Sequence, residues 1–133
     1  MKIEIIIKPK TRRPQKIKKA ECAWTISAVF DDGKKKDIDG TVSIPNASIK
    51  TAALIALRDA LGRFNKPAVI KLYIHEDFTR SMLAGGMLAR WEKNDWRKIR
   101  RNEELRHRDL WKEISAMLKM HAVSIAKKEE MEK

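Results

Sequence analysis

The stretch VIKLYIHEDF, residues 69–78, organises the chain. It is a short apolar run with several β-branched residues, Pro67 precedes it, and acidic residues follow it, which predicts a buried strand at the centre of a sheet. In α/β folds, binding and catalytic groups commonly lie where such a strand gives way to a helix. His75 occupies that position. A second stretch, residues 90–111, combines tryptophan with arginine and is the other candidate for function.

Charge and length limit the possible functions. The chain has 133 residues, 30 Lys and Arg and 18 Asp and Glu, which gives a net charge of +12. A length of this order suits a single domain. The positive charge favours polyanionic partners, with nucleic acid first and an acidic membrane surface second, although solubility alone is the other reading. The single cysteine, Cys22, excludes an intramolecular disulfide and is expected in the core.

The amino terminus does not read as a signal peptide. The apolar part of MKIEIIIKPK is too short for a signal peptide, and no run of eighteen apolar residues is present. A cytoplasmic protein without a membrane span is therefore expected. We expect one domain over residues 1–126 and a charged C-terminal tail over residues 127–133.

The first third of the chain predicts an antiparallel meander. Residues 2–7 form a β-branched run, and residues 8–19 form a basic, proline-containing loop. The second strand is expected over residues 23–30, the turn at residues 31–33 and the third strand over residues 36–44.

Helices are expected on either side of the stretch at residues 69–78. Asn46 or Ser48 is expected to cap a helix that carries apolar residues with a period near 3.6 and stops near Gly62. After the strand, a helical segment over residues 78–83 leads through Gly85 and Gly86 into a second helical segment, residues 87–96.

The end of the chain is expected to add one more helix and one more strand. Asn102 is expected to start this last helix, with Leu110, Ile114, Met117 and Leu118 on one face. Residues 122–126 are expected to form the final strand.

This order of elements resembles the type 1 ribonuclease H fold. The marks that carry the resemblance are MKIEIII at residues 1–7, AWTISAVFDDGKKKDI at 23–38, TAALIALRDAL at 51–61, LYIHEDF at 72–78, W-x4-W-R-K at 91–98 and R-x-R-D-L-W at 106–111. The resemblance implies an α/β, ribonuclease H-like fold. In this fold a five-stranded mixed sheet, with three antiparallel strands followed by parallel strands, is flanked by helices.

The resemblance also implies where metal ligands would stand. That family cuts the RNA strand of an RNA–DNA hybrid with two magnesium ions held by carboxylates. The corresponding positions here hold Lys8, Ile49 and His75, and the fourth would lie in a terminal helix that we do not expect within these 133 residues. Shifting the alignment by one residue brings Glu76 near the third position, but one acid does not hold two ions. We therefore expect no metal, no cofactor and no catalysis, which would make the protein a pseudoenzyme.

Nucleic-acid binding is assigned to basic residues, to polar residues matching the family pattern, and to tryptophans whose flat faces suit sugars or bases. Lys8 is expected to bind a phosphate where a metal would stand, although an exposed strand-end lysine is the other reading. For Trp91 and Trp111, the alternative to binding is packing in the core. For His75, the alternative to a general base or metal ligand is a plain hydrogen-bonded role. The predicted binding residues are Lys8, Lys10, Arg12, Arg13, Asn46, Trp91, Lys93, Trp96, Arg97, Lys98, Arg100, Arg101, Arg106, His107 and Arg108.

The functional hypothesis is a non-catalytic ribonuclease H-like domain that binds nucleic acid, as an RNA–DNA hybrid or another duplex. The alternative is a protein-interaction or assembly module of the same fold, with a protein partner or a second copy covering sheet surface left bare. A third reading is a residual metal-dependent nuclease.

Overall fold

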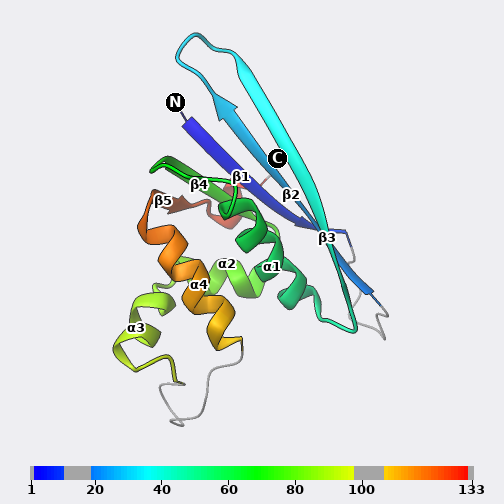
Figure 1. Ribbon diagram of the computed structural model, residues 1–133, viewed down its shortest axis with the longest axis vertical. Coiled ribbons are helices and arrows are strands. Elements are labelled where there is room, and N and C mark those ends of the chain that lie inside the picture. The colour runs from blue at the N-terminus through cyan, green and yellow to red at the C-terminus, as the bar shows by residue number, and fades with distance from the viewer. Residues whose placement is uncertain (1, 11–18, 98–106, 132–133) are drawn as a thin grey trace.

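A computed structural model describes residues 2–10, 19–97 and 107–131. Its mixed sheet has the strand order β3-β2-β1-β4-β5, as Figure 1 shows. The central strand is β1, Lys2–Pro9, which pairs antiparallel with β2 and parallel with β4. The expectation that residues 69–78 hold the centre is therefore wrong. That stretch supplies β4, Val69–Ile74, which lies between β1 and the edge strand β5, Ala122–Ile125.

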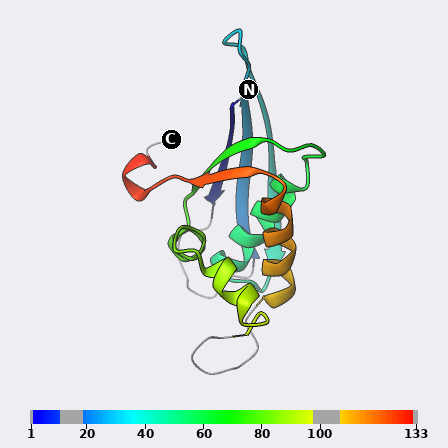
Figure 2. The ribbon, with the colours of Figure 1, turned by 90° about the vertical axis from the view of Figure 1, so that its left-hand side faces the viewer.

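The antiparallel meander of the first three strands is confirmed. β2, Lys19–Val29, pairs with β3, Lys35–Pro45, and the turn between them includes Gly33 with a positive φ of 85°. β2 begins earlier than predicted, because the alternation of buried residues already starts at Ala20. The β2–β3 hairpin projects beyond the helices (Figures 1 and 2), and the first five residues of β3 are exposed.

The two faces of the sheet differ in what covers them. Ile5, Trp24 and Leu72 point to one face, here called the helix face, where α1, Ile49–Leu61, packs against the strands to form the core. Glu4, Lys71 and Tyr73 point to the opposite side, here called the open face. This division follows from the two-residue period of strands, which places alternate side chains on alternate faces.

The helices after β4 complete the helix side. They are α2, Asp77–Ala84, α3, Met87–Lys93, and α4, Arg108–Lys119, and α4 packs against α1. Gly86, with a φ of 73°, joins α2 to α3 as predicted. α3 ends before the predicted Trp96, because Asp95 and Trp96 both adopt left-handed backbone angles.

The predicted start of the last helix at Asn102 lies outside the described residues. The apolar stripe predicted for that helix packs partly or fully into the core, with Trp111 added to it. After β5, a short 3-10 turn, η1, spans Lys128–Glu130, and its Glu130 carboxylate pairs with Lys71 on the open face. Within the described ranges, no helix is both long and apolar enough to cross a membrane.

Candidate nucleic-acid interface

The carboxyl ends of β1 and β4 bring Lys8 and His75 together. The two strands are parallel, with Ile7 opposite Ile74, so the residues that follow this pair lie at the same edge of the sheet. The His75 backbone N–H donates to the Ile7 carbonyl at 2.8 Å, which fixes His75 beside the end of β1. Lys8 is exposed, whereas His75 is partly buried. With Arg80, they form what we call the strand-end site.

The His75 ring is held in its neutral form. Burial lowers the pKa of His75 below its ordinary value, and the positive charges of Lys8 and Arg80 lower it further. Its Nε2 atom is buried and finds no hydrogen-bond partner within the described part of the chain. At neutral pH the strand-end site therefore contains two cations and an uncharged imidazole.

Arg80 is anchored by contacts that the sequence did not reveal. Its Nη1 donates to the Ile74 carbonyl at 2.8 Å, and its Nη2 pairs with the Asp77 carboxylate. Its side chain is only 12% exposed. The guanidinium is thus fixed close to His75, where its charge acts on the imidazole.

Glu76 is occupied by the start of α2. One carboxylate oxygen accepts from the Phe78 amide at 2.8 Å, and the other accepts from the Thr79 amide at 2.9 Å and from the Thr79 hydroxyl. This is the usual work of an N-cap side chain, which satisfies amides that have no partner within the helix. The acid that a shifted alignment would offer as a ligand therefore has a structural role.

The strand-end residues do not fit the two magnesium ions that the resemblance implies. Magnesium prefers oxygen ligands, whereas the Lys8 ammonium has no lone pair and Ile49 has no donor atom. Within residues 2–10, 19–97 and 107–131, no group of three or more His, Cys, Asp or Glu side chains is placed to hold a metal ion. Cys22 offers no nucleophile either, because burial raises the pKa of its thiol to about 12.

The start of α1 lies against the start of α4. Ser48 caps α1 by accepting from the Thr51 amide at 3.1 Å, whereas Asn46 is exposed and has a left-handed φ of 52°. The His107 Nε2 atom lies 2.9 Å from the Thr51 hydroxyl oxygen, and His107 is itself the N-cap residue of α4. Two residues separated by 56 positions are thereby joined, and no local sequence pattern predicted it.

The tryptophans are core residues. Trp91 is 5% exposed, Trp96 8% and Trp111 2%, and the rings of Trp91 and Trp111 pack with centroids 5.2 Å apart. The expectation that Trp91 and Trp96 present flat faces to sugars or bases is not met, because their rings are used inside the domain. The core alternative holds for Trp91 and Trp111.

The remaining predicted binding residues fall into two groups. Lys8, Lys10, Lys93 and Arg97 are exposed, while Arg108 is partly buried. The others lie outside the described residues: Arg12, Arg13, Lys98, Arg100, Arg101 and Arg106. The structure therefore places only part of the predicted basic surface.

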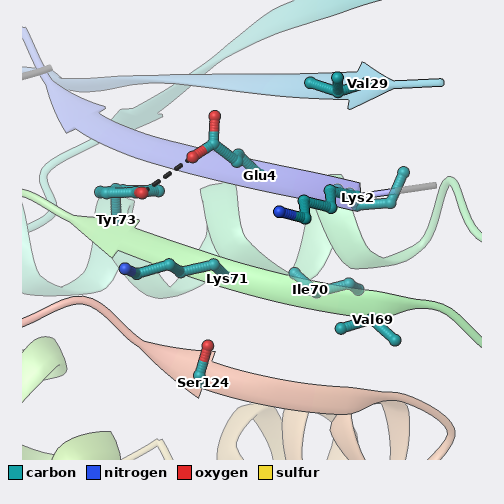
Figure 3. A pocket seen from close by; sticks show the side chains of 9 residues that line it. Lys2, Glu4, Val29, Val69, Ile70, Lys71, Tyr73 and Ser124 are labelled. Carbon is teal, nitrogen blue, oxygen red and sulfur yellow. Dashed lines mark hydrogen bonds between the residues drawn. The ribbon is translucent and has the colours of Figure 1, made fainter. Parts of the chain in front are cut away.

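The open face carries a separate hollow of about 450 Å³ (Figure 3). Lys2, Glu4 and Val69 are among its lining residues, and the Tyr73 hydroxyl donates to the Glu4 carboxylate at 2.8 Å on its floor. The hollow lies toward the Lys2 end of β1, away from Lys8. Sequence reasoning assigned no function to these residues.

Comparison with known proteins agrees with the fold expected from the sequence. No protein-family model matches the chain. A curated protein of Moorella thermoacetica named Ribonuclease H is 29% identical over 101 residues, which cover 75% of this chain and 63% of that protein. The chain thus spans less than two thirds of the length of that relative.

Solved structures give the same result. A type 1 ribonuclease H with the type 2 active-site motif superimposes with a TM-score of 0.76 at 13% identity, over 93% of this chain and 61% of that one. A foamy viral protease-reverse transcriptase in complex with an RNA/DNA hybrid gives a TM-score of 0.63 at 14% identity, over 94% of this chain and 17% of that one. The predicted type 1 ribonuclease H-like fold and its mixed five-stranded sheet are confirmed.

Proposed function

We propose that this chain, whose fold is that of the ribonucleases H, binds a nucleic-acid duplex through phosphate contacts and does not cut it. The observation that carries the proposal is the strand-end site. Where the resembled family places metal-binding carboxylates, this chain has Lys8 and a neutral His75, with Arg80 anchored by the Ile74 carbonyl and Asp77. A cation at this position attracts a phosphate directly, without an intervening metal ion.

The charge of the whole chain supports the same proposal. The net charge of +12 favours a polyanion, and Lys10, Lys93 and Arg97 add exposed cations to Lys8. Contacts of this kind recognise the shape and backbone of a duplex rather than its base sequence. An RNA–DNA hybrid is the first duplex to test, since a structural neighbour is described in complex with one. We also propose that the protein is located in the cytoplasm.

Fluorescence anisotropy tests the binding. An RNA–DNA hybrid, duplex DNA, duplex RNA and single strands are titrated at several salt concentrations, with and without magnesium. We expect a preference for the hybrid or for another duplex, independent of magnesium and steeply weakened by salt. Weak and equal affinity for every polyanion would overturn the proposal and leave only generic charge.

A matched pair of variants tests the strand-end site itself. Lys8→Ala and Lys35→Ala remove the same charge from opposite ends of the sheet, since Lys35 pairs with Val29 at the hairpin end. We expect Lys8→Ala to weaken binding and to reduce the slope of log affinity against log salt by about one unit. Lys35→Ala is expected to change neither. Equal effects from the two variants would remove Lys8 from the interface.

A cleavage assay tests the absence of catalysis. Because the curated relatives are named Ribonuclease H, the purified protein is incubated with a labelled hybrid and magnesium or manganese. We expect no product above that of the buffer alone. Product that persists through repurification and falls in a Glu76→Gln variant would instead support the residual nuclease reading.

The open face favours a second candidate, a protein-interaction or assembly module. Val69, beside the hollow, is 64% exposed, and the edge strand β5 is only four residues long. Exposed apolar residues and sheet edges are common sites of protein contact. Light scattering at high protein concentration tests self-association, and a Val69→Ser variant serves as its control. A clean monomer that binds duplex tightly would favour the first proposal.

A further inference from the structure

The His75 ring is surrounded by groups whose charges are already fixed. Lys8 approaches from β1, and Arg80 approaches from α2 with its guanidinium held by the Ile74 carbonyl and the Asp77 carboxylate. Cys22, which pairs with Pro9 in the register of β1 and β2, has a thiol that stays neutral because burial raises its pKa to about 12. The neighbouring Glu76 carboxylate is turned to the amides of α2. His75 is therefore the group at this site whose charge can change near neutral pH.

A phosphate beside Lys8 reverses the electrostatic balance at the ring. In the free protein, two positive charges disfavour a third on the imidazole. A phosphodiester carries one negative charge, and it offsets these cations when it binds next to them. The imidazolium form then becomes less costly, because the phosphate charge offsets those of Lys8 and Arg80.

We propose that His75 takes up a proton when a backbone phosphate of a duplex binds beside Lys8, so that proton binding and duplex binding strengthen each other. This inference rests on the proposed function, since it names a property of the same site. Thermodynamic linkage requires the effect to be reciprocal: a duplex that favours the protonated ring binds more tightly at lower pH. If the pKa of His75 rises by one unit on binding, the duplex binds about tenfold more tightly at a pH well below both pKa values than at a pH well above them.

The first arm of the test measures affinity against pH. Hybrid affinity is determined between pH 8 and pH 5.5 at constant ionic strength for the unmodified protein, His75→Gln and, as a control outside the predicted interface, His121→Gln. Other groups also titrate, so the quantity that matters is the difference between proteins. We expect the unmodified protein and His121→Gln to gain up to about tenfold more affinity on acidification than His75→Gln does. Equal pH dependence in all three proteins would overturn the inference.

The second arm counts protons directly. Calorimetric titrations at pH 6.5 in two buffers with different ionisation enthalpies give the number of protons taken up on binding. We expect a fractional uptake for the unmodified protein and a value near zero for His75→Gln. If His75→Gln does not fold, the titration of the His75 ring is followed by NMR in the unmodified protein with and without duplex.

These outcomes separate the two proposals. Duplex binding without proton uptake, or an NMR midpoint of His75 that the duplex leaves unchanged, would overturn the inference and leave the proposed function standing. An absence of duplex binding at every pH would overturn both. Proton uptake that disappears in His75→Gln supports both.

Discussion

Ile5 and Ile6 are neighbours in β1, yet they belong to different environments. Ile5 is fully buried on the helix face with Trp24 and Leu72, whereas Ile6 is only partly buried on the open face. On the open face the side chains meet through polar contacts, such as that between Tyr73 and Glu4 (Figure 3). Because most buried apolar side chains of the sheet lie on the helix face, substitutions there are expected to cost more stability than substitutions on the open face.

The largest expected effect comes from a substitution on the helix face, at Ile5. Ile5→Ala removes a fully buried side chain and is expected to lower the free energy of unfolding by about 2–5 kcal/mol, because it leaves a cavity in the core. Ile6→Ala is the matched control and is expected to cost about 1 kcal/mol. Urea unfolding measures both. Equal losses would contradict the assignment of the two faces.

The next effect tests how closely the helix face is packed at Gly40. A Cβ atom at Gly40 would lie 2.5 Å from the Trp24 ring, which itself is 1% exposed and donates to the Asp59 carboxylate at 2.7 Å. Gly40→Ala is therefore expected to lower the free energy of unfolding by about 1–3 kcal/mol, as overpacking does. Thr41→Ala, one residue further and on the open face, is the control. A stable Gly40→Ala protein with unchanged tryptophan fluorescence would refute the close contact.

A smaller effect is expected on the open face. Tyr73→Phe removes the hydroxyl that donates to Glu4 while it keeps the buried ring. Loss of one such bond is expected to lower the free energy of unfolding by about 0.5–1.5 kcal/mol. Chemical denaturation measures this free energy. A loss as large as that of Ile5→Ala would contradict the placement of the core on the helix face.

The smallest effect is a pH dependence at two histidines. The pKa values of His75 and His121 are both lowered, chiefly by burial. The unfolded chain therefore binds protons below its ordinary histidine pKa, about 6.5, that the folded chain resists. Stability is expected to fall as the pH drops from 7.5 through 6.5 to 5.5, before carboxylates titrate. Urea midpoints at each pH give the dependence of stability on pH, and this dependence should weaken in His75→Gln. A stability that does not change over this pH range would count against the burial of the two rings.

Much of the fold was accessible from the sequence, because strands and helices leave local patterns. The hairpin turn, the glycine joint at Gly86 and the paired alternation along β2 are all local. The position of β4 was missed for a physical reason: its apolar run looks like that of β1, and the strand order of a sheet is set by pairing between distant residues.

The candidate site was less accessible from the sequence. Lys8 and His75 were identified from the resemblance, but the anchoring of Arg80 and the contact of His107 with Thr51 depend on tertiary structure. The tryptophans misled for a related reason. Trp91 and Trp96 stand among basic residues in the sequence, but burial depends on which side of a helix or turn faces the core, and here both rings face inward.

The double pairing of β1 has a consequence for folding. Its antiparallel partner β2 follows closely in the chain, whereas its parallel partner β4 begins only at Val69. During synthesis all three strands of the meander emerge well before β4. Until β4 pairs with it, the β1 edge opposite β2 has unpaired backbone N–H and C=O groups. Closing that edge requires contacts that are distant in sequence, and such contacts form slowly. The pairing of β4 with β1 is therefore expected to be later in folding than the pairing of β1 with β2.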